Sequence, residues 1–127
     1  MAYSKKILIA EDESALREVL HDRFEKSGYE VEVAKDGAEV MPMVQKIKPD
    51  IILLDLVMPK KNGFEVLAEL KAHPDYKVIP VIVISNLGGD EDIKKSLTLG
   101  AVDYFVKAQH PMKEIVEKVE AILAKGV

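Results

Sequence analysis

The chain has 127 residues, a length typical of a single domain, and its 48% hydrophobic and 31% charged residues can form one core beneath a hydrated surface. The net charge of −4, without a long run of lysine or arginine, argues against a nucleic-acid-binding surface. The absence of cysteine excludes disulfides and thiolate metal sites, and no apolar stretch reaches the ~20 residues that a membrane-spanning helix needs.

Residues 6–10 are predicted to form the first strand, which ends at the acidic run Glu11-Asp12-Glu13. Ser14 is predicted to cap the following helix, and Gly28 to end it. Apolar residues recur in this helix at helical spacing: Leu16, Val19, Leu20 and Phe24. The next strand has apolar residues that alternate with charged ones, which predicts an edge strand: Tyr29, Val31 and Val33.

The second helix is predicted to open with Asp36 and Glu39 as a capping pair. Its apolar face contains Val40, Val44 and Ile47. Pro42 lies inside this pattern, and a proline in a helix interior costs ~3 kcal/mol, so we expect either a kink or a late start of the helix. Pro49 closes the segment.

The central stretch of the sequence is 50–63, in which Ile51–Leu54 form an unbroken apolar run that ends at Asp55. Such a run is typical of a strand buried on both faces of a parallel sheet. Three residues after it predict a loop: Pro59, Asn62 and Gly63. A third helix is predicted from Phe64, Leu67 and Leu70, and it ends at Pro74.

Val81–Ile84 are predicted to form another buried strand, which ends on Ser85 and Asn86. The fourth helix follows Gly88-Gly89 and an acidic segment, and Gly100 ends it. Its apolar face is thin, mainly Ile93 and Leu97, so we expect it to be among the more mobile elements.

The last strand is predicted at Asp103–Val106 and ends on Lys107. Pro111 suits the first turn of a final helix, whose core residues are Ile115, Val119, Ile122 and Leu123. Five alternating βα units predict an α/β fold with a parallel sheet, helices on both faces and right-handed crossovers. The expected architecture is one doubly wound, flavodoxin-like (βα)5 domain over 1–127 with strand order 2-1-3-4-5.

Four of the five predicted strands end in side chains that can do chemistry: Glu11-Asp12, Asp55, Ser85 and Lys107. In a parallel sheet these ends lie on one edge, and the strand order 2-1-3-4-5 places the carboxylates in one crevice. Close carboxylates repel one another, and a bound Mg²⁺ would relieve the repulsion. With a hydroxyl and an ammonium added, the set is suited to an aspartyl-phosphate site in which Asp55 is the nucleophile.

Over essentially its whole length, the sequence resembles the receiver domain of bacterial two-component response regulators, in the single-domain form of the chemotaxis regulators. The matching residues are Glu11-Asp12, Asp55-Leu-Val-Met-Pro with Asn62-Gly63, Ser85, Lys107, and Tyr104 at the family's aromatic switch position.

The resemblance implies that Asp55 takes a phosphoryl group from a sensor histidine kinase or a histidine phosphotransfer protein. Asp12, Asp55 and the backbone carbonyl of Val57 would ligate Mg²⁺, and Glu11 would act mostly through water. Ser85 and Lys107 would bind the phosphoryl oxygens.

Ser85 and Tyr104 would switch the partner-binding face, formed by the fourth helix, the fifth strand and the fifth helix, toward a downstream protein target. The expected protein is cytoplasmic, has no nucleic-acid or membrane partner, and catalyses only its own phosphorylation and dephosphorylation.

Two residues depart from the family pattern. Ala108 follows Lys107 where the family usually has a proline, often after a cis bond, so the sequence leaves the cis or trans state of this bond open. Asn86 follows Ser85 where a small residue is usual, and it could narrow access to Asp55 or add a donor.

The main alternative function is a phosphorylation-independent interaction module of the same fold. An aspartyl-phosphate phosphatase would need a second Asp two residues after the nucleophile, where Val57 stands, and no glycine-rich nucleotide-binding pattern occurs. Both a stand-alone protein and a domain of a longer one fit the sequence, with Lys125-Gly126-Val127 slightly favouring the former. The sequence does not identify the cognate kinase, the output, the oligomeric state or the phosphoryl lifetime. It assigns no function to His21, His73 or His110.

Overall fold

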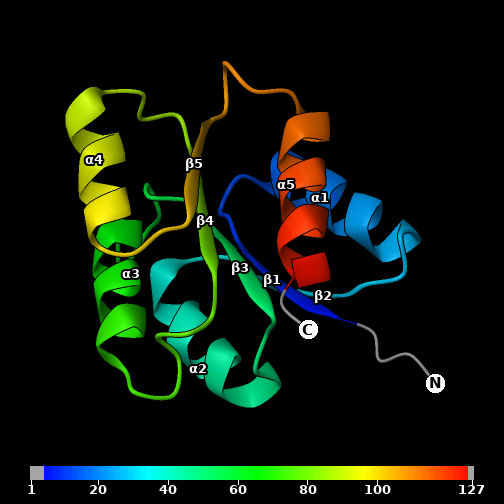
Figure 1. Ribbon diagram of the computed structural model, residues 1–127, viewed down its shortest axis with the longest axis horizontal. Coiled ribbons are helices and arrows are strands. Elements are labelled where there is room, and N and C mark those ends of the chain that lie inside the picture. The colour runs from blue at the N-terminus through cyan, green and yellow to red at the C-terminus, as the bar shows by residue number, and fades with distance from the viewer. Residues whose placement is uncertain (1–4, 126–127) are drawn as a thin grey trace.

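A computed structural model describes residues 5–125, in which five strands and five helices alternate along the chain (Figure 1). The elements are β1 (Lys6–Ala10), α1 (Ser14–Lys26), β2 (Glu30–Ala34), α2 (Gly37–Ile47), β3 (Ile51–Leu54), α3 (Gly63–Ala72), β4 (Val81–Ser85), α4 (Asp90–Thr98), β5 (Asp103–Val106) and α5 (Met112–Lys125). All paired strands are parallel, and their order is β2-β1-β3-β4-β5. The predicted doubly wound, flavodoxin-like fold is confirmed.

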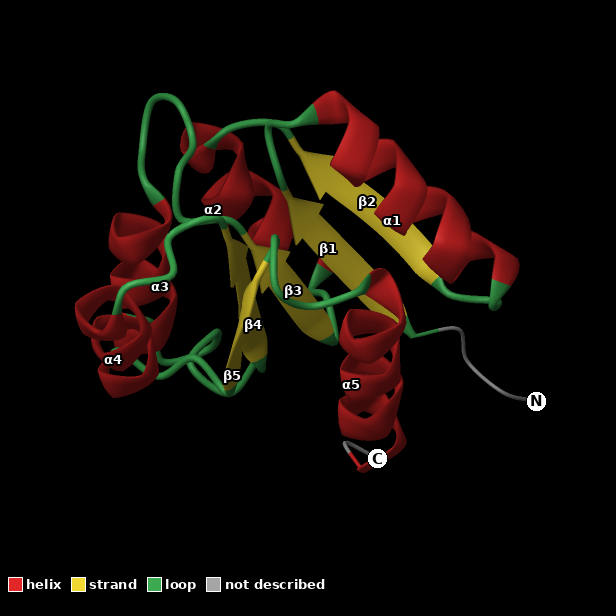
Figure 2. Ribbon diagram, turned by 90° about the horizontal axis from the view of Figure 1, so that it is seen from above, coloured by secondary structure: helices red, strands yellow, loops and turns green. Residues whose placement is uncertain are grey.

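The sheet separates two helical layers, with α1 and α5 on one face and α2, α3 and α4 on the other (Figures 1 and 2). Each layer has its own apolar core against the sheet. β3 contributes to both cores, since Ile51 and Leu53 pack with the α1 and α5 layer and Ile52 and Leu54 with the opposite layer. This two-sided burial explains why the central strand is an unbroken apolar run. No helix in the described part is long and apolar enough to cross a membrane.

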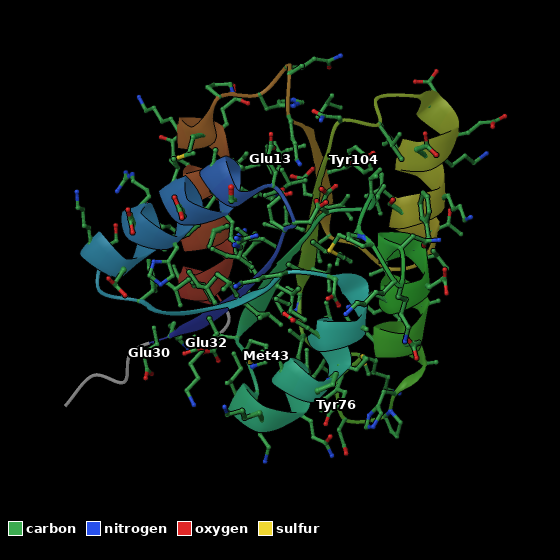
Figure 3. All side chains as sticks on the ribbon, turned by 180° about the vertical axis from the view of Figure 1, so that it is seen from behind. Glu13, Glu30, Glu32, Met43, Tyr76 and Tyr104 are labelled. Carbon is green, nitrogen blue, oxygen red and sulfur yellow. The ribbon has the colours of Figure 1, made fainter. Side chains whose placement is uncertain are left out.

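β2 lies at one edge of the sheet, as its alternating pattern predicts. Glu30 and Glu32 are exposed along it, whereas Val31 and Ala34 are buried (Figure 3). Charged side chains on an edge strand oppose pairing with another chain.

One predicted feature near a helix start is wrong, and one of the two alternatives predicted at Pro42 is excluded. Ser14 does not cap α1, because Glu13 is extended and its carbonyl accepts the first helical bond from the N–H of Arg17 at 3.0 Å. α2 does not start late at Pro42 but runs from Gly37 to Ile47, capped as predicted by Asp36, whose Oδ1 accepts from the N–H of Glu39 at 3.0 Å. Pro42 and Ala38 are both exposed, so water can replace the backbone donor that the proline lacks.

The apolar faces of two helices are narrower than their sequence patterns suggest. Val19 in α1 is 49% exposed and is not a core residue. In α4, Leu97 is 45% exposed and Ile93 is only partly buried, so Ser96 is the one fully buried residue of that helix. The thin apolar face predicted for α4 is confirmed.

Candidate functional site

The register between β1 and β3 brings two acidic residues together at the carboxyl edge of the sheet. Ala10 pairs with Leu54, so Glu11 and Asp55 leave adjacent strand ends side by side. The N–H of Asp55 donates to the carbonyl of Ala10 at 3.0 Å, which fixes the end of β3 against β1. Two apolar strands that pair in parallel therefore deliver their first polar residues to one place.

Glu11, Asp12 and Asp55 form an acidic cluster in which one carboxylate oxygen of each lies within 4.8 Å of the others. Glu11 and Asp55 are buried, and Asp12 is exposed. Three oxygen donors at this separation fit a hard divalent cation such as Mg²⁺, which prefers carboxylates and water as ligands. The acidic cluster can therefore hold a metal ion and keep one side of it open to solvent.

The ammonium of Lys107 reaches this cluster from the end of β5. Its Nζ lies 2.8 Å from Glu11 Oε1 and 3.0 Å from Asp55 Oδ2. Burial acts to lower the pKa of Lys107, but its bonds to these two carboxylates outweigh burial and raise the pKa overall. Lys107 is therefore a fixed positive charge beside the Asp55 carboxylate.

Glu11 has a pKa far from its ordinary value. Burial raises its pKa to about 7, and the charge of Asp55 adds to the rise although the bond to Lys107 opposes it. Its second oxygen, Oε2, accepts from the N–H of Glu13 at 3.0 Å. Both oxygens of Glu11 thus have protein partners, which suits an indirect role near a cation.

The loop after Asp55 holds that carboxylate in position. Its Oδ1 accepts from the N–H of Val57 at 3.2 Å, and the side chain of Val57 is 56% exposed. The chain then returns beneath the site at Gly63, whose N–H donates to the carbonyl of Leu56 at 2.8 Å. A Cβ at Gly63 would lie only 2.3 Å from the carbonyl oxygen of Asp55, so a glycine is required there.

The backbone of Ser85 is bonded to that of Lys107, because the Ser85 carbonyl accepts from the N–H of Lys107 at 2.9 Å. This bond places Ser85 beside the acidic cluster. Its fully buried Oγ accepts from the N–H of Leu87 at 3.2 Å. The hydroxyl of Tyr104 donates to the carbonyl of the same Leu87, and the Tyr104 ring is buried. Burial, with the charges of Asp92 and Asp55, raises the pKa of Tyr104, and the Ser85 hydroxyl opposes this rise. Ser85 and Tyr104 therefore hold the same loop residue.

The segment after Lys107 closes into a turn with Ala108, not a proline, as its first residue. The Lys107–Ala108 bond is trans, as are all peptide bonds of the described chain. The N–H of Val106 donates to His110 Nδ1 at 3.0 Å, and the His110 ring meets the Phe105 ring edge-on at 5.2 Å. His110, which the sequence left without a role, thus fixes the turn that follows Lys107.

Two further residues near the cluster were missed from the sequence. Arg17 donates through Nη1 to the carbonyls of Glu11 and Asp12, at 3.1 and 3.2 Å, and so holds the acidic turn. The carboxylate of Glu13 lies 3.7 Å from Lys107 Nζ. In the sequence, two features could have pointed to these contacts: the third acid in the run Glu11-Asp12-Glu13, and the four-residue spacing from Glu13 to Arg17.

Residues 7–120 match the protein family described as "Response regulator receiver domain". A probable transcriptional regulator, ycf27 of Cyanophora paradoxa, is 39% identical over 121 residues, which are 95% of this chain and 49% of that protein. The chain thus spans about half the length of the curated relatives that it matches.

Two solved structures are also similar. The phosphorylated cyanobacterial phytochrome response regulator RcpA aligns with a TM-score of 0.87 and 33% identity, over 98% of this chain and 97% of that one. The Mn²⁺-bound form of response regulator Rcp1 aligns with a TM-score of 0.83 and 32% identity, over 97% of this chain and 96% of that one.

Proposed function

Because the chain belongs to the response regulator receiver domain family, we propose that its phosphoacceptor is Asp55 and that phosphorylation there operates it as a signalling switch. One observation carries the proposal: the Lys107 ammonium lies 3.0 Å from the buried carboxylate of Asp55, within the acidic cluster. A carboxylate nucleophile beside a fixed positive charge is what transfer of an anionic phosphoryl group requires.

Mg²⁺ is the cation that we assign to the acidic cluster. Asp12 and Asp55, with the backbone carbonyl of Val57, would hold it, and Glu11 would act through water because both its oxygens have protein partners. When bound, the ion would neutralise negative charge on the transferring phosphoryl group. The Mn²⁺ named for the similar Rcp1 structure supports a divalent cation at such a site.

The remaining residues have distinct roles in the proposal. Lys107 binds a phosphoryl oxygen and prevents the negative charges from repelling one another. The Ser85 hydroxyl gives up the hydrogen bond that its Oγ accepts from the N–H of Leu87 and donates its own hydrogen to a phosphoryl oxygen. Tyr104, bonded to the carbonyl of Leu87, follows the loop. The chain catalyses only its own phosphorylation and dephosphorylation.

Receiver domains take phosphoryl groups from histidine kinases and act on downstream targets. For this chain we propose a sensor histidine kinase or a histidine phosphotransfer protein as donor. The downstream protein would bind the face formed by α4, β5 and α5. Curated relatives are named as transcriptional regulators, so the expectation of no nucleic-acid partner applies only to the segment 1–127. A cytoplasmic location is part of the proposal.

The proposal is tested by incubating the chain with a small phosphodonor and Mg²⁺ and mapping the adduct by mass spectrometry. We expect one phosphoryl group on Asp55, lost in Asp55→Asn and on chelation of the metal. Asp75→Asn, an exposed carboxylate in the α3–β4 loop, is the matched control and should label normally. Labelling that survives Asp55→Asn unchanged would reject the assignment.

The alternative, a phosphorylation-independent interaction module, predicts a different result for the metal. A functional acidic cluster should bind Mg²⁺ in a titration followed by amide NMR, with shifts centred on Asp12 and Asp55. A chain that shows neither Mg²⁺ binding nor labelling would instead fit the interaction module.

A further inference from the structure

Lys107 faces a third carboxylate that the proposed phosphorylation does not use. Glu13 Oε1 lies 3.7 Å from Lys107 Nζ, in addition to Glu11 and Asp55. Figure 3 shows Glu13 at the start of α1, on the same side of the molecule as Tyr104 and opposite Tyr76. Glu13 therefore lies at the edge of the acidic cluster, against Lys107.

The three carboxylates around Lys107 differ in how firmly they are held. Glu11 and Asp55 are buried, and the second oxygen of each accepts a backbone N–H. The Glu13 side chain is 57% exposed, while that of Lys107 is 12% exposed. Of the three, Glu13 is thus the carboxylate that an incoming anion can displace from the ammonium.

The Glu13 side chain does not cap α1. Glu13 is the N-cap residue of α1, but its carboxylate makes no capping hydrogen bond. The N-cap residues of α2 and α3, Asp36 and Asn62, both accept from the N–H three residues later. A shorter side chain would cap α1 better, so the length of Glu13 serves its contact with Lys107.

We propose that Glu13 determines which phosphoryl donors react fast with Asp55, by covering the exposed side of Lys107 and repelling small dianions. The inference rests on the proposed function of Asp55. A donor with less negative charge is repelled less, so Glu13 favours donors whose phosphoryl group is attached to a protonated nitrogen over anionic acyl phosphates.

The chemical step is the same for both donor classes. An oxygen of the Asp55 carboxylate forms a bond to phosphorus while the bond to the leaving group breaks. From acetyl phosphate, a dianion at neutral pH, acetate leaves with the bonding electron pair. Phosphoramidate carries one negative charge fewer because its nitrogen is protonated. Ammonia leaves from it with the bonding electron pair and then takes a proton from water.

The test compares initial rates of Asp55 labelling by these two donors, at saturating Mg²⁺, in the unchanged chain and in Glu13→Gln. We expect the rate with acetyl phosphate to rise about three- to tenfold in Glu13→Gln at low ionic strength, and the rate with phosphoramidate to rise less. The gain should shrink toward onefold in about 0.5 M salt, because exposed charges are screened. Glu18→Gln makes the same change of charge at an exposed position of α1 and should leave both rates unchanged.

Two additions keep the test decisive. If Glu13→Gln does not fold, Glu13→Ser removes the carboxylate and supplies a good N-cap, and the same acceleration is expected. Binding of fluoroberyllate to the Mg²⁺ form, followed by amide NMR, should also tighten severalfold in either variant, without any turnover.

Equal rates in Glu13→Gln and Glu18→Gln would overturn the inference, as would an acceleration that is the same for both donors and insensitive to salt. In both cases labelling at Asp55 would leave the proposed function intact. If the unchanged chain labels with neither donor, the proposed function and this inference both fail.

Discussion

The acidic cluster of Glu11, Asp12 and Asp55 meets the Lys107 ammonium at the carboxyl edge of the sheet, and each carboxylate of the cluster has a different environment. Glu11 is buried with both oxygens bonded, Asp55 is buried beside Lys107, and Asp12 is exposed. These differences determine what substitution or titration of each residue should do.

Titration of Glu11 should make the metal-free protein less stable as pH rises. A free glutamate carboxyl has a pKa of 4.5, whereas the pKa of Glu11 in the folded chain is about 7, so between these values the folded state holds the proton that the unfolded state has lost. The contribution of this group to stability is therefore highest below about pH 4.5 and falls, by on the order of 3 kcal/mol, as pH rises through about 7.

Urea unfolding at about pH 5 and about pH 8, without metal, measures this effect against Glu11→Gln, which cannot titrate. The variant should lack the part of the pH dependence that Glu11 causes. An identical pH dependence in both proteins would show that Glu11 titrates normally in the folded state.

Removal of the exposed Asp12 carboxylate should relieve repulsion within the acidic cluster. We expect Asp12→Ala to raise the stability of the metal-free protein by roughly 0.5–1 kcal/mol and to abolish Mg²⁺ binding. Denaturant unfolding with and without Mg²⁺ tests both effects. A clear loss of stability without metal would instead assign Asp12 a structural bonding role.

Val57 should influence how long the phosphoryl group lasts. Its exposed side chain can neither donate nor accept a hydrogen bond, whereas a polar group two residues after Asp55 can hold the attacking water. We expect slow self-hydrolysis, accelerated severalfold by Val57→Asn. The rate of self-hydrolysis is measured as the decay of the phosphorylated chain after the donor is removed. Val78→Asn, which changes another exposed valine, is the control. Equal decay in Val57→Asn and the unchanged chain would show that Val57 does not control the access of water.

At the scale of whole elements, α4 is the helix held most weakly to the sheet. Its one fully buried residue is Ser96, and within the described residues the Ser96 hydroxyl has no hydrogen-bond partner. A buried polar group without a partner destabilises the folded state. The helix next to the Ser85–Leu87 loop is thus the one that is easiest to displace.

Removal of the Ser96 hydroxyl should stabilise the packing of α4 against the sheet. We expect Ser96→Ala to stabilise the protein by about 1 kcal/mol and to slow amide hydrogen exchange in α4. Ser14→Ala, at an exposed helical position, controls for the higher helix propensity of alanine. Faster exchange in α4 of Ser96→Ala would mean that the hydroxyl supports the helix.

The sequence was sufficient for the elements and their order because periodicity, glycines and prolines act locally. Short apolar or alternating runs and the βα alternation predicted all five parallel strands correctly. The start of α1 was wrong because the turn Glu11-Asp12-Glu13 is shaped by Arg17, a tertiary effect that helix propensity does not contain. The late start of α2 at Pro42 was excluded only by the structure, because the cost of the proline depends on solvent access to the freed carbonyl.

The candidate site was partly predictable for a similar reason. Parallel strands must end at one edge, so Glu11, Asp12, Asp55 and Lys107 were placed together from the sequence, and the structure brings them together. The contacts of Glu13 with Lys107 and of His110 with Val106 depend on side-chain reach across loops. No sequence period encodes such reach.

At the scale of the molecule, one short path joins the acidic cluster to the proposed partner-binding face. The Ser85 hydroxyl contacts the N–H of Leu87, and the Tyr104 hydroxyl contacts its carbonyl. The Tyr104 ring is buried in the structure, and we expect a second, outward position of the ring and a movement between the two positions. A phosphoryl group at Asp55 can shift this equilibrium only if it favours one position energetically, which the Ser85 contact would provide.

Amide NMR shifts, recorded with and without fluoroberyllate in Mg²⁺, test this coupling most directly. We expect shifts around Asp55 and also throughout 90–107, and we expect Ser85→Ala to reduce the shifts near Tyr104 while Asp55 still becomes phosphorylated. Shifts confined to the loops around Asp55, with 90–107 silent, would contradict the coupling.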